Sequence, residues 1–358
     1  MNLPLKPRLM SVDVFRGWTV AAMLVVNNAG DWNQVYRWLE HSEWNGCTAA
    51  DYIFPFFLFL VGAGLGLSEK AGASEAERRQ QWRAACWRSL RLIALGLALH
   101  LVAAMTIDGR AFRLPGVLQR IGLCFLLASG WLLCLRQPRW RWCSIAALGL
   151  GYSLILLNAA SLAPDVNPAD RLDSLLLGHF AMDYDVRRGV GSDPEGLLST
   201  LGALMNVLIG VMAATLLRRG KRSGLLGCAL LLMLVGQLIG FWLPFNKHLW
   251  TPSFALWTAG AACMVLLALH QLNDRLGVPA IGRSLGINAI VVYAGSWLAA
   301  CGLAWSGWGT WIYRQVFLAV LTPAFSQQFA SAMFACALTL IFCGVALFMN
   351  RRGWRVVI

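Results

Sequence analysis

The chain has 358 residues, of which 58% are hydrophobic and only 13% charged, and its formal net charge is +13. A soluble domain carries roughly 25% charged residues. Apolar runs of about 20 residues, which recur along this chain, are long enough to cross a bilayer. The composition therefore excludes an ordinary soluble protein and predicts an all-α, polytopic membrane protein with one transmembrane domain over residues 1–358.

About ten membrane-spanning helices are predicted, in chain order, over residues 13–30, 49–68, 88–106, 116–135, 142–161, 195–217, 223–243, 252–270, 286–303 and 329–349. The apolar segment 311–321 is too short to span, so we expect it to lie in the interface or to re-enter the bilayer. Ser74 and Glu77 form a capping-box pattern that predicts a short solvated helix before residue 88.

The basic residues give the orientation. With the N-terminus in the cytoplasm, twenty of the thirty basic residues fall on the cytoplasmic side and eight on the other side. This positive-inside bias predicts cytoplasmic N- and C-termini in a multi-pass protein. We expect its location to be a bacterial inner or plasma membrane. Contact with anionic lipid accounts for the net charge, so no nucleic-acid partner is expected. The cysteines and histidines lack ligand spacing, so no metal is expected either.

Several ionisable and amide side chains stand at the mouths of the first two helices. His41 is a candidate general base, and the alternative is a hydrogen-bonded interface histidine. Asp51 opens the second helix, where it can complement the helix dipole, hold His41 or pair with Arg120. Asn27 can donate to an oxyanion, although asparagine is also common at the end of a helix.

Further polar groups lie at both predicted membrane surfaces. On the outer side, Asp193 is a predicted N-cap of the sixth helix, with Glu195 in its first turn. On the inner side, basic residues are placed to dock a cytosolic anion. For Arg16 the alternative is a local ion pair with Asp13, three residues away.

Eight blocks in this chain resemble the heparan-α-glucosaminide N-acetyltransferase family, and they occur in the family's order. They are Ser11-Val12-Asp13-Val14-Phe15-Arg16-Gly17, Met23 to Asn27, His41-x-x-Trp44-Asn45-Gly46-x-Thr48-x-x-Asp51-x-x-Phe54-Pro55, Pro115-Gly116-Val117-Leu118-Gln119-Arg120, Asp173-x-Leu175-Leu176-Leu177-Gly178, Asp193-Pro194-Glu195-Gly196, Asn246-Lys247-x-Leu249-Trp250 and Asn288-Ala289-Ile290-x-Val292-Tyr293. Each block alone is weak evidence, but eight in order are strong.

The resemblance implies an acetyltransferase that carries acetyl from cytosolic acetyl-CoA to the amine of a glucosamine-type sugar on the periplasmic side, with His41 as the catalytic histidine and Asn27 as its amide partner. The family's luminal domain is not represented, so we expect a small amino sugar, a cell-wall fragment or a surface glycan as acceptor. To the acceptor we assign Trp44, Asn45, Asp51, Arg120, Asp193, Glu195, Asn246, Lys247 and Trp250. To acetyl-CoA we assign Arg8, Arg16, Arg283, Ser284, Asn288 and Tyr293. A homodimer is also an expectation.

Two other functions fit the same sequence. An amino-sugar transporter predicts broken helices, and Gly62, Gly64 and Gly66 in the second helix are compatible with a break, although close helix packing is the commoner reason for such glycines. An O-acyltransferase of a surface glycan has the same donor and a hydroxyl acceptor. The sequence does not separate direct transfer from a route through acetylated His41.

Overall fold

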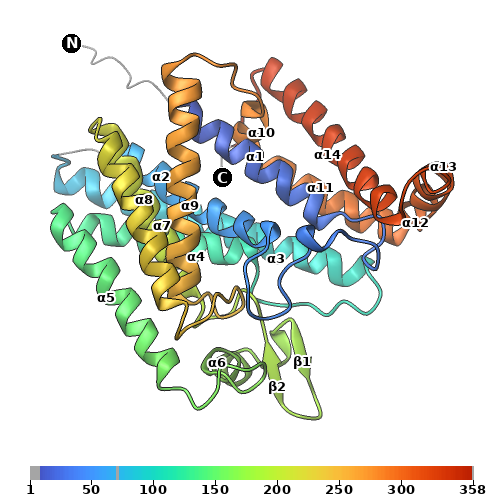
Figure 1. The fold of residues 1–358 in the computed structure, drawn as a ribbon, viewed down its shortest axis with the longest axis horizontal. Helices are drawn as coiled ribbons and strands as arrows, with labels where there is room; N and C mark the ends of the chain where they lie inside the picture. The colour runs from blue at the N-terminus through green and yellow to red at the C-terminus, as the bar shows by residue number, and fades with distance from the viewer. Residues whose placement is uncertain (1–8, 70–71, 357–358) are drawn as a thin grey trace.

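The computed structural model describes residues 9–69 and 72–356, and this part of the chain is almost entirely helical (Figure 1). The long helices are α1 (Met10–Asn27), α2 (Ile53–Ser68), α3 (Glu75–Thr106), α4 (Val117–Cys134), α5 (Pro138–Leu157), α7 (Thr200–Arg218), α8 (Arg222–Ile239), α9 (Pro252–Leu269), α11 (Ala289–Trp305) and α14 (Gln327–Arg351). The shorter elements are α6 (Pro168–Leu176), α10 (Arg283–Ile287), α12 (Trp308–Ile312), α13 (Ala319–Leu321) and an antiparallel pair of strands, β1 (Asp183–Asp185) and β2 (Val190–Ser192).

Within the described residues, eight helices are long and apolar enough to cross a membrane, and α11 together with the bent segment that follows it makes a possible ninth. The predicted number was about ten. The helix α1 is not among the eight, because its 18 residues include Asp13, Arg16 and Asn27. The prediction of an all-α, polytopic membrane protein is confirmed.

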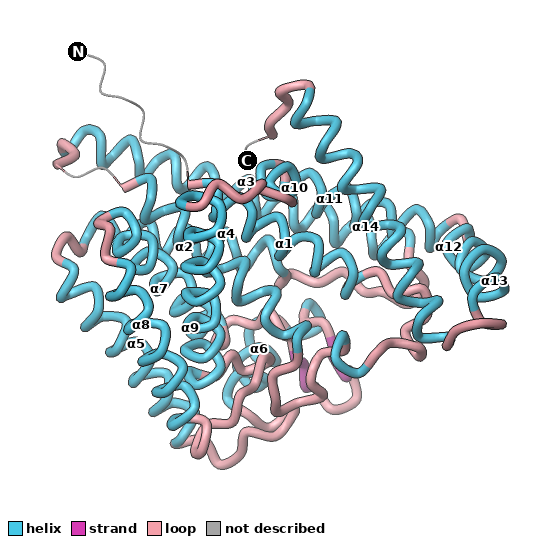
Figure 2. The backbone as a smooth tube through the Cα atoms, turned by 45° about the horizontal axis from the view of Figure 1, so that its top comes forward, coloured by secondary structure: helices cyan, strands magenta, loops and turns pink. Residues whose placement is uncertain are grey.

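Contacts between distant segments define two ends of the bundle. At one end, Glu69 forms an ion pair with Arg141 and accepts a hydrogen bond from Arg218 through its backbone carbonyl, and Asp274 accepts a hydrogen bond from the backbone N–H of Met10. We call this the basic end: residues 9–10, 69, 72–88, 134–141, 218–222, 270–288 and 350–356. The first and last described residues both lie there (Figure 2).

The opposite end carries the longer connections, with α6 and the two strands among them (Figure 2). We call it the loop end: residues 28–52, 107–116, 158–199 and 240–251. Its segments are joined by side-chain contacts, such as the hydrogen bond from Trp44 Nε1 to the carbonyl of Leu162. The sequence predicted no regular structure in 162–194, where α6, β1 and β2 form.

The helix α3 is longer than predicted. Ser74 caps it as expected, because its Oγ accepts from the N–H of Glu77 and its own N–H donates to Glu77 Oε2 at 2.8 Å. The predicted short helix and the predicted span 88–106 are one continuous helix of 32 residues. The reason is that no glycine or proline interrupts the chain between them.

The glycines of α2 pack against a neighbouring helix or open into space, and α2 is unbroken through them. A Cβ added to Gly62 would lie 1.8 Å from the carbonyl oxygen of Val207 in α7, and one added to Gly66 would lie 2.6 Å from that of Val211. A Cβ at Gly64 would meet nothing within 4 Å. Two of the three glycines therefore permit close packing of α2 on the buried helix α7.

The segment 308–321 turns away from α11 by 86°. It contains α12, a π-helical stretch over Tyr313–Leu318, and α13. In Figure 1 it lies at the edge of the bundle, beyond the end of α11.

Candidate active site

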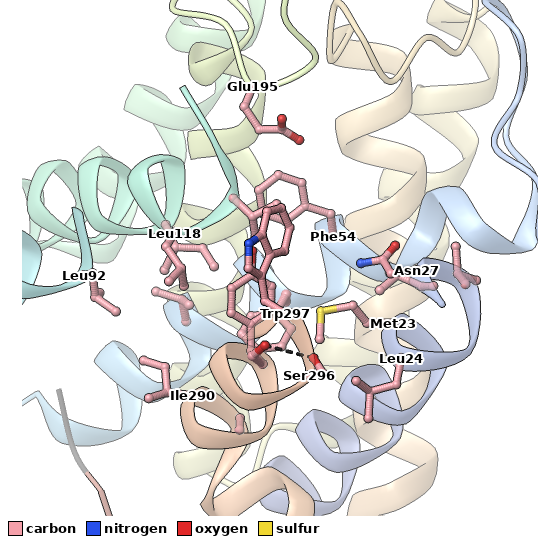
Figure 3. Close-up of a pocket in the computed structure, with 18 of the residues that line it drawn as sticks. Met23, Leu24, Asn27, Phe54, Leu92, Leu118, Glu195, Ile290, Ser296 and Trp297 are labelled. Atoms are coloured by element: carbon pink, nitrogen blue, oxygen red, sulfur yellow. Dashed lines mark hydrogen bonds between the residues drawn. The ribbon is translucent and has the colours of Figure 1, made fainter. Parts of the chain in front are cut away.

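A cavity of about 740 Å³ runs through the bundle between α1, α2, α3, α4 and α11. It extends from Ala50, in the loop end, along α2 to Ser68, near the basic end. Most of its wall is apolar, with Met23, Leu118 and Trp297 among the side chains drawn in Figure 3. Polar groups lie mainly toward its two ends: His41, Glu195 and Lys247 at the loop end, and Arg16 and Arg88 toward the basic end.

His41 is held by a buried carboxylate. Its Nδ1 lies 2.8 Å from Oδ1 of Asp51, which is fully buried, whereas the His41 side chain is 46% exposed and lines the cavity. The other oxygen of Asp51, Oδ2, accepts hydrogen bonds from the backbone N–H and hydroxyl of Ser42 and of Thr48. Because Oδ1 accepts from Nδ1–H, Nε2 is the ring nitrogen that can accept a proton.

The loop that carries His41 is fastened to the turn between α8 and α9. The backbone N–H of Gly46 donates to the carbonyl of Phe245 at 2.7 Å, and Asn246 Nδ2 donates to Asn45 Oδ1 at 3.2 Å. Asn45 and Asn246 also form an isolated antiparallel bridge. We call these contacts the 45–246 latch.

The latch places Lys247 beside His41. The Lys247 Nζ lies 3.0 Å from both ring nitrogens of His41 and 3.7 Å from Oδ1 of Asp51. Burial lowers the pKa of Lys247, while the carboxylates of Asp51 and Glu195 act in the opposite direction. At the loop end of the cavity, the imidazole of His41, the ammonium of Lys247 and the carboxylate of Asp51 therefore contact one another.

A second cluster of charged side chains, Arg113, Asp193 and Glu195, lies near the cluster around His41. Nη1 of Arg113 lies 3.1 Å from Glu195 Oε2 and 3.3 Å from Asp193 Oδ1. Burial acts to lower the pKa of Arg113, but the two carboxylates outweigh it and raise that pKa. Burial likewise acts to raise the pKa of Glu195, but the cations of Arg113 and Arg120 outweigh it and lower that pKa. Glu195 is therefore a carboxylate at neutral pH, and it points toward the cavity (Figure 3).

Asn27 is the last residue of α1 and its amide faces the cavity (Figure 3). The next residue, Asn28, uses its own amide to donate to the carbonyl of Leu24 at 2.8 Å and so terminates the helix. Among the described residues, Asn27 makes no side-chain hydrogen bond, so its N–H groups remain available to a ligand.

The pairing of Asp51 with Arg120 is wrong. Asp51 pairs with His41 and Lys247, whereas Arg120 donates to the carbonyl of Gly196 at 2.8 Å and to Ser199 Oγ at 2.6 Å. The guanidinium also lies 5.2 Å from the ring centroid of Trp250. Arg120 is buried outside the cavity, and its contacts hold the turn that carries Glu195.

The predicted N-cap role of Asp193 is also wrong, because α7 begins at Thr200 and not at residue 195. Asp193 instead closes a turn: its carboxylate accepts from the N–H groups of Glu195 and Met182, each at 2.9 Å. Helix formation starts only beyond this turn, so Pro194 and Glu195 are free to line the cavity.

Four other residues assigned to the acceptor lie behind the cavity wall. The ring of Trp44 lies against that of His248 in a tilted arrangement, with ring centroids 5.2 Å apart, and Asn45 and Asn246 bind each other in the latch. Trp250 is fully buried, and its Nε1 donates to Asn206 Oδ1. These residues shape the loop end, whereas Glu195 and Lys247 reach the cavity.

Of the residues assigned to acetyl-CoA, Arg16 and Tyr293 line the cavity. Arg16 also forms the expected local ion pair, with Nη1 3.4 Å from Asp13 Oδ1, and donates to the carbonyl of Gly286. The remaining assigned residues lie elsewhere: Arg283 near Asp13, Ser284 bound to Asn350, Asn288 fully buried off the cavity, and Arg8 outside the described residues.

Sequence reasoning missed Arg88, Arg110, Arg113 and Trp297, all of which line the cavity. Arg113 lies two residues before the Pro115-Gly116 block, and that proximity was the available signal. The partners of Arg113 are 80 and 82 residues away in the chain, so no local spacing reveals them.

The buried carboxyl of Asp173 predicts that the stability of the protein depends on pH. Burial raises the pKa of its carboxyl from 3.8 to about 6, and Oδ2 is buried without a hydrogen-bond partner among the described residues. Folding therefore disfavours the ionised form, by about 3 kcal/mol above pH 6. The penalty shrinks as the pH falls from 6 toward 4, because the carboxyl becomes protonated. We expect Asp173→Asn to raise the melting temperature in detergent at pH 8 and to lose this advantage near pH 4.

The matched control is Asp165→Asn, because Asp165 pairs with Arg188 in a partly exposed position. It should show no gain in melting temperature at pH 8. A lower melting temperature for Asp173→Asn than for the unmodified protein at pH 8 would contradict the assigned penalty.

Comparison with known proteins gives one consistent result. The model of the family "Heparan-alpha-glucosaminide N-acetyltransferase, catalytic" matches residues 8–178. The Homo sapiens protein named Heparan-alpha-glucosaminide N-acetyltransferase is 28% identical over 362 residues, covering 81% of this chain and 53% of the relative. The Mus musculus protein of the same name is 28% identical over 357 residues, covering 80% and 53%.

The chain thus spans about half the length of the curated relatives it matches. The family model covers α1 to α6 and includes His41, Asp51 and Asn27, while Glu195 and Lys247 lie beyond it. These matches confirm that this chain is similar to the heparan-alpha-glucosaminide N-acetyltransferase family, as its motifs predict.

Proposed function

We propose that this protein is a membrane acyltransferase that moves an acetyl group from acetyl-CoA to the amine of a glucosamine-type sugar. The observation that carries the proposal is the cavity of about 740 Å³, which has His41, Asn27 and Lys247 at one end and arginines toward the other. A base, an amide donor and a path for a long, thin donor substrate are the parts that such a transfer needs.

The donor enters from the basic end in this proposal. Coenzyme A carries phosphates, and Arg16 and Arg88 line the cavity there. The narrow pantetheine arm then follows the face of α2 toward His41. The excess of basic residues at this end supports its placement in the cytoplasm of a bacterial cell, with the acceptor on the periplasmic side. A homodimer remains part of the proposal.

The transfer forms one C–N bond and breaks one C–S bond. Nε2 of His41 takes a proton from the sugar ammonium, and the free amine attacks the thioester carbonyl. The tetrahedral oxyanion accepts a hydrogen bond from Asn27, a contact of a kind that contributes about 3–4 kcal/mol. Lys247, 3.0 Å from the imidazole, supplies positive charge where negative charge develops. Collapse of the intermediate expels the CoA thiolate, which receives the proton from His41 and leaves as CoA. The imidazole freed in this way takes the remaining extra proton from the attacking nitrogen and passes it to water, which leaves the neutral amide.

Asp51 acts through His41. Its hydrogen bond to Nδ1 fixes the tautomer in which Nε2 carries no proton, and the carboxylate stabilises the imidazolium that forms when Nε2 is protonated. A route through acetylated His41 uses the same residues. Rapid quenching with labelled acetyl-CoA and no acceptor separates the routes, because only the second accumulates an acetyl-enzyme.

Release of free CoA from acetyl-CoA and glucosamine by the purified protein tests the proposal. We expect turnover with glucosamine and none with N-acetylglucosamine, whose amine is already acylated. Gly64→Leu should raise the KM for acetyl-CoA by about tenfold or more, because Gly64 lines the cavity and a side chain there projects into open space. The same substitution should leave folding intact.

The matched control is Gly151→Leu. Gly151 is an exposed helical glycine of α5 with open space at its Cβ and no place on the cavity wall. Equal KM values for the two variants would contradict the donor path. Uptake of glucosamine into vesicles without release of CoA would favour a transporter, and turnover with N-acetylglucosamine would favour O-acylation.

A further inference from the structure

Two tryptophans in the described part of the chain line the cavity, Trp32 at the loop end and Trp297 in α11. The ring of Trp297 already has close neighbours. The Arg110 guanidinium lies 4.9 Å from its centroid, and the rings of His100 and Tyr293 lie 5.7 Å and 6.2 Å away. Trp32 is 64% exposed, and among the described residues its ring pairs with no aromatic ring or cation and its Nε1–H donates no hydrogen bond. Trp32 is therefore the indole whose face is open to a molecule in the cavity.

The loop that carries Trp32 is fixed to α14 through hydrogen bonds of its neighbours. The hydroxyl of Ser331 accepts from the N–H of Asp31 at 3.0 Å and donates to the carbonyl of Asp31 at 3.1 Å. The N–H of Gly30 donates to the Ser331 carbonyl at 3.4 Å, and the N–H of Gln34 closes a turn onto the Asp31 carbonyl at 3.1 Å. Trp32 lies inside this turn. Its backbone, and not the packing of its ring, therefore holds the indole at the cavity, so the ring can be removed without breaking these contacts.

The indole belongs to the same end of the cavity as the proposed base. Asn27 and His41, which lie before and after Trp32 in the chain, line the cavity with it, and the Asn27 amide faces inward (Figure 3). The two tryptophans that the sequence assigned to the acceptor, Trp44 and Trp250, lie behind the cavity wall. An acceptor whose amine reaches His41 therefore has the ring of Trp32 available on the wall of the same end.

We propose that Trp32 binds the acceptor by stacking on the apolar face of its pyranose ring, and so selects a cyclic amino sugar over an open-chain amine. A pyranose carries its hydroxyl groups around the edge and C–H groups on its faces, and the negative face of an indole attracts such C–H groups. The free Nε1–H of the indole can donate to a sugar hydroxyl. An open-chain amino alcohol has no rigid face to offer. The inference rests on the proposed acetyl transfer and deepens it, because it names the residue that recognises the sugar ring.

Tryptophans also anchor proteins at the membrane surface, and Trp38 in the same loop provides the comparison. Trp38 is 60% exposed, as Trp32 nearly is, but its ring stacks on Tyr36 with centroids 6.1 Å apart and does not line the cavity. A role at the membrane surface applies to both tryptophans, whereas binding of a sugar in the cavity applies to Trp32 alone. Trp38→Ala is therefore the matched control for Trp32→Ala.

The test compares glucosamine with glucosaminitol, its reduced open-chain form, as acceptors. We expect the unmodified protein to have a KM about tenfold lower for glucosamine than for glucosaminitol, and Trp32→Ala to remove this difference by raising the KM for glucosamine. Trp32→Phe keeps an aromatic face and should restore most of the difference. The KM for acetyl-CoA should change by less than about threefold in both variants. Trp38→Ala should keep the full preference for the cyclic sugar.

Calorimetric binding of glucosamine without acetyl-CoA is the second measurement. Binding that is weakened by Trp32→Ala and not by Trp38→Ala supports the inference even if no sugar is acetylated, in which case the proposed acetyl transfer alone is contradicted. Glucosamine binding that is equal in the unmodified protein and Trp32→Ala, or absent from both, overturns the inference. Equal losses of activity and of melting temperature in Trp32→Ala and Trp38→Ala also overturn it and assign both rings to the membrane surface.

Discussion

Replacing His41 by alanine should lower the rate of acetyl transfer by roughly 10²–10⁴-fold, the usual contribution of a general base. The imidazole faces the cavity and is 46% exposed, so its loss leaves no large void in the protein core. Asp51 keeps its four hydrogen bonds from Ser42 and Thr48 and retains Lys247 as a cation 3.7 Å away. The fold and the binding of CoA should therefore survive. Release of CoA measures the rate, and calorimetry measures the binding.

His179→Ala is the matched control, since His179 is an exposed histidine of the same end that lies off the cavity. Its rate should match that of the unmodified protein. Full activity in His41→Ala would remove His41 from the mechanism. Joint loss of activity and of CoA binding would make it a structural residue.

Asp51→Asn should lower kcat by about 10³–10⁴-fold with little change in the KM for acetyl-CoA. The N–H groups of Ser42 and Thr48 point at Oδ2, so the amide of the variant must place its oxygen there and its NH₂ toward His41. Nδ1 then accepts a hydrogen bond, the ring proton moves to Nε2, and the base is lost. Steady-state kinetics with varied acetyl-CoA separates kcat from KM.

Asp108→Asn is the control, because Asp108 is an exposed carboxylate on another loop of the same end. It should leave both constants unchanged. Asp51→Asn could instead raise the KM and lower the melting temperature without changing kcat. In that case Asp51 would stabilise the loop that carries His41 and would not set the tautomer of the imidazole. A rate within about tenfold of normal would mean that the tautomer of His41 is set by another group.

The sequence predicted the parts of the fold that depend on local pattern. Apolar runs located the long helices, and the capping box of Ser74 and Glu77 located the start of α3. The start of α7 was misplaced by five residues because Asp193 and Pro194 fit a helix N-terminus as well as they fit the turn that they form. Local spacing cannot distinguish these two uses of the same residues.

The candidate site also has contacts that the sequence could suggest and contacts that it could not. His41 and Asp51 are ten residues apart, so their pairing was among the alternatives that the sequence offered. The contact of His41 with Lys247 spans 206 residues, and that of Arg113 with Glu195 spans 82. Such pairs depend on how helices pack, which a single sequence does not specify. For the same reason, the sequence could not show that the pairing of Arg120 with Asp51, one of the alternatives for Asp51, does not form.

The 45–246 latch determines when, during synthesis of the chain, the candidate site can assemble. The loop with His41 emerges early in synthesis, yet its fixed position depends on Phe245 and Asn246, about 200 residues later. Helices α2 to α8 must therefore be inserted before the imidazole, its carboxylate and Lys247 come together. A nascent chain that stops before Phe245 has the histidine but neither the latch nor Lys247. Activity should therefore appear only late in translation, once the α8–α9 turn has reached the same side of the membrane as the loop.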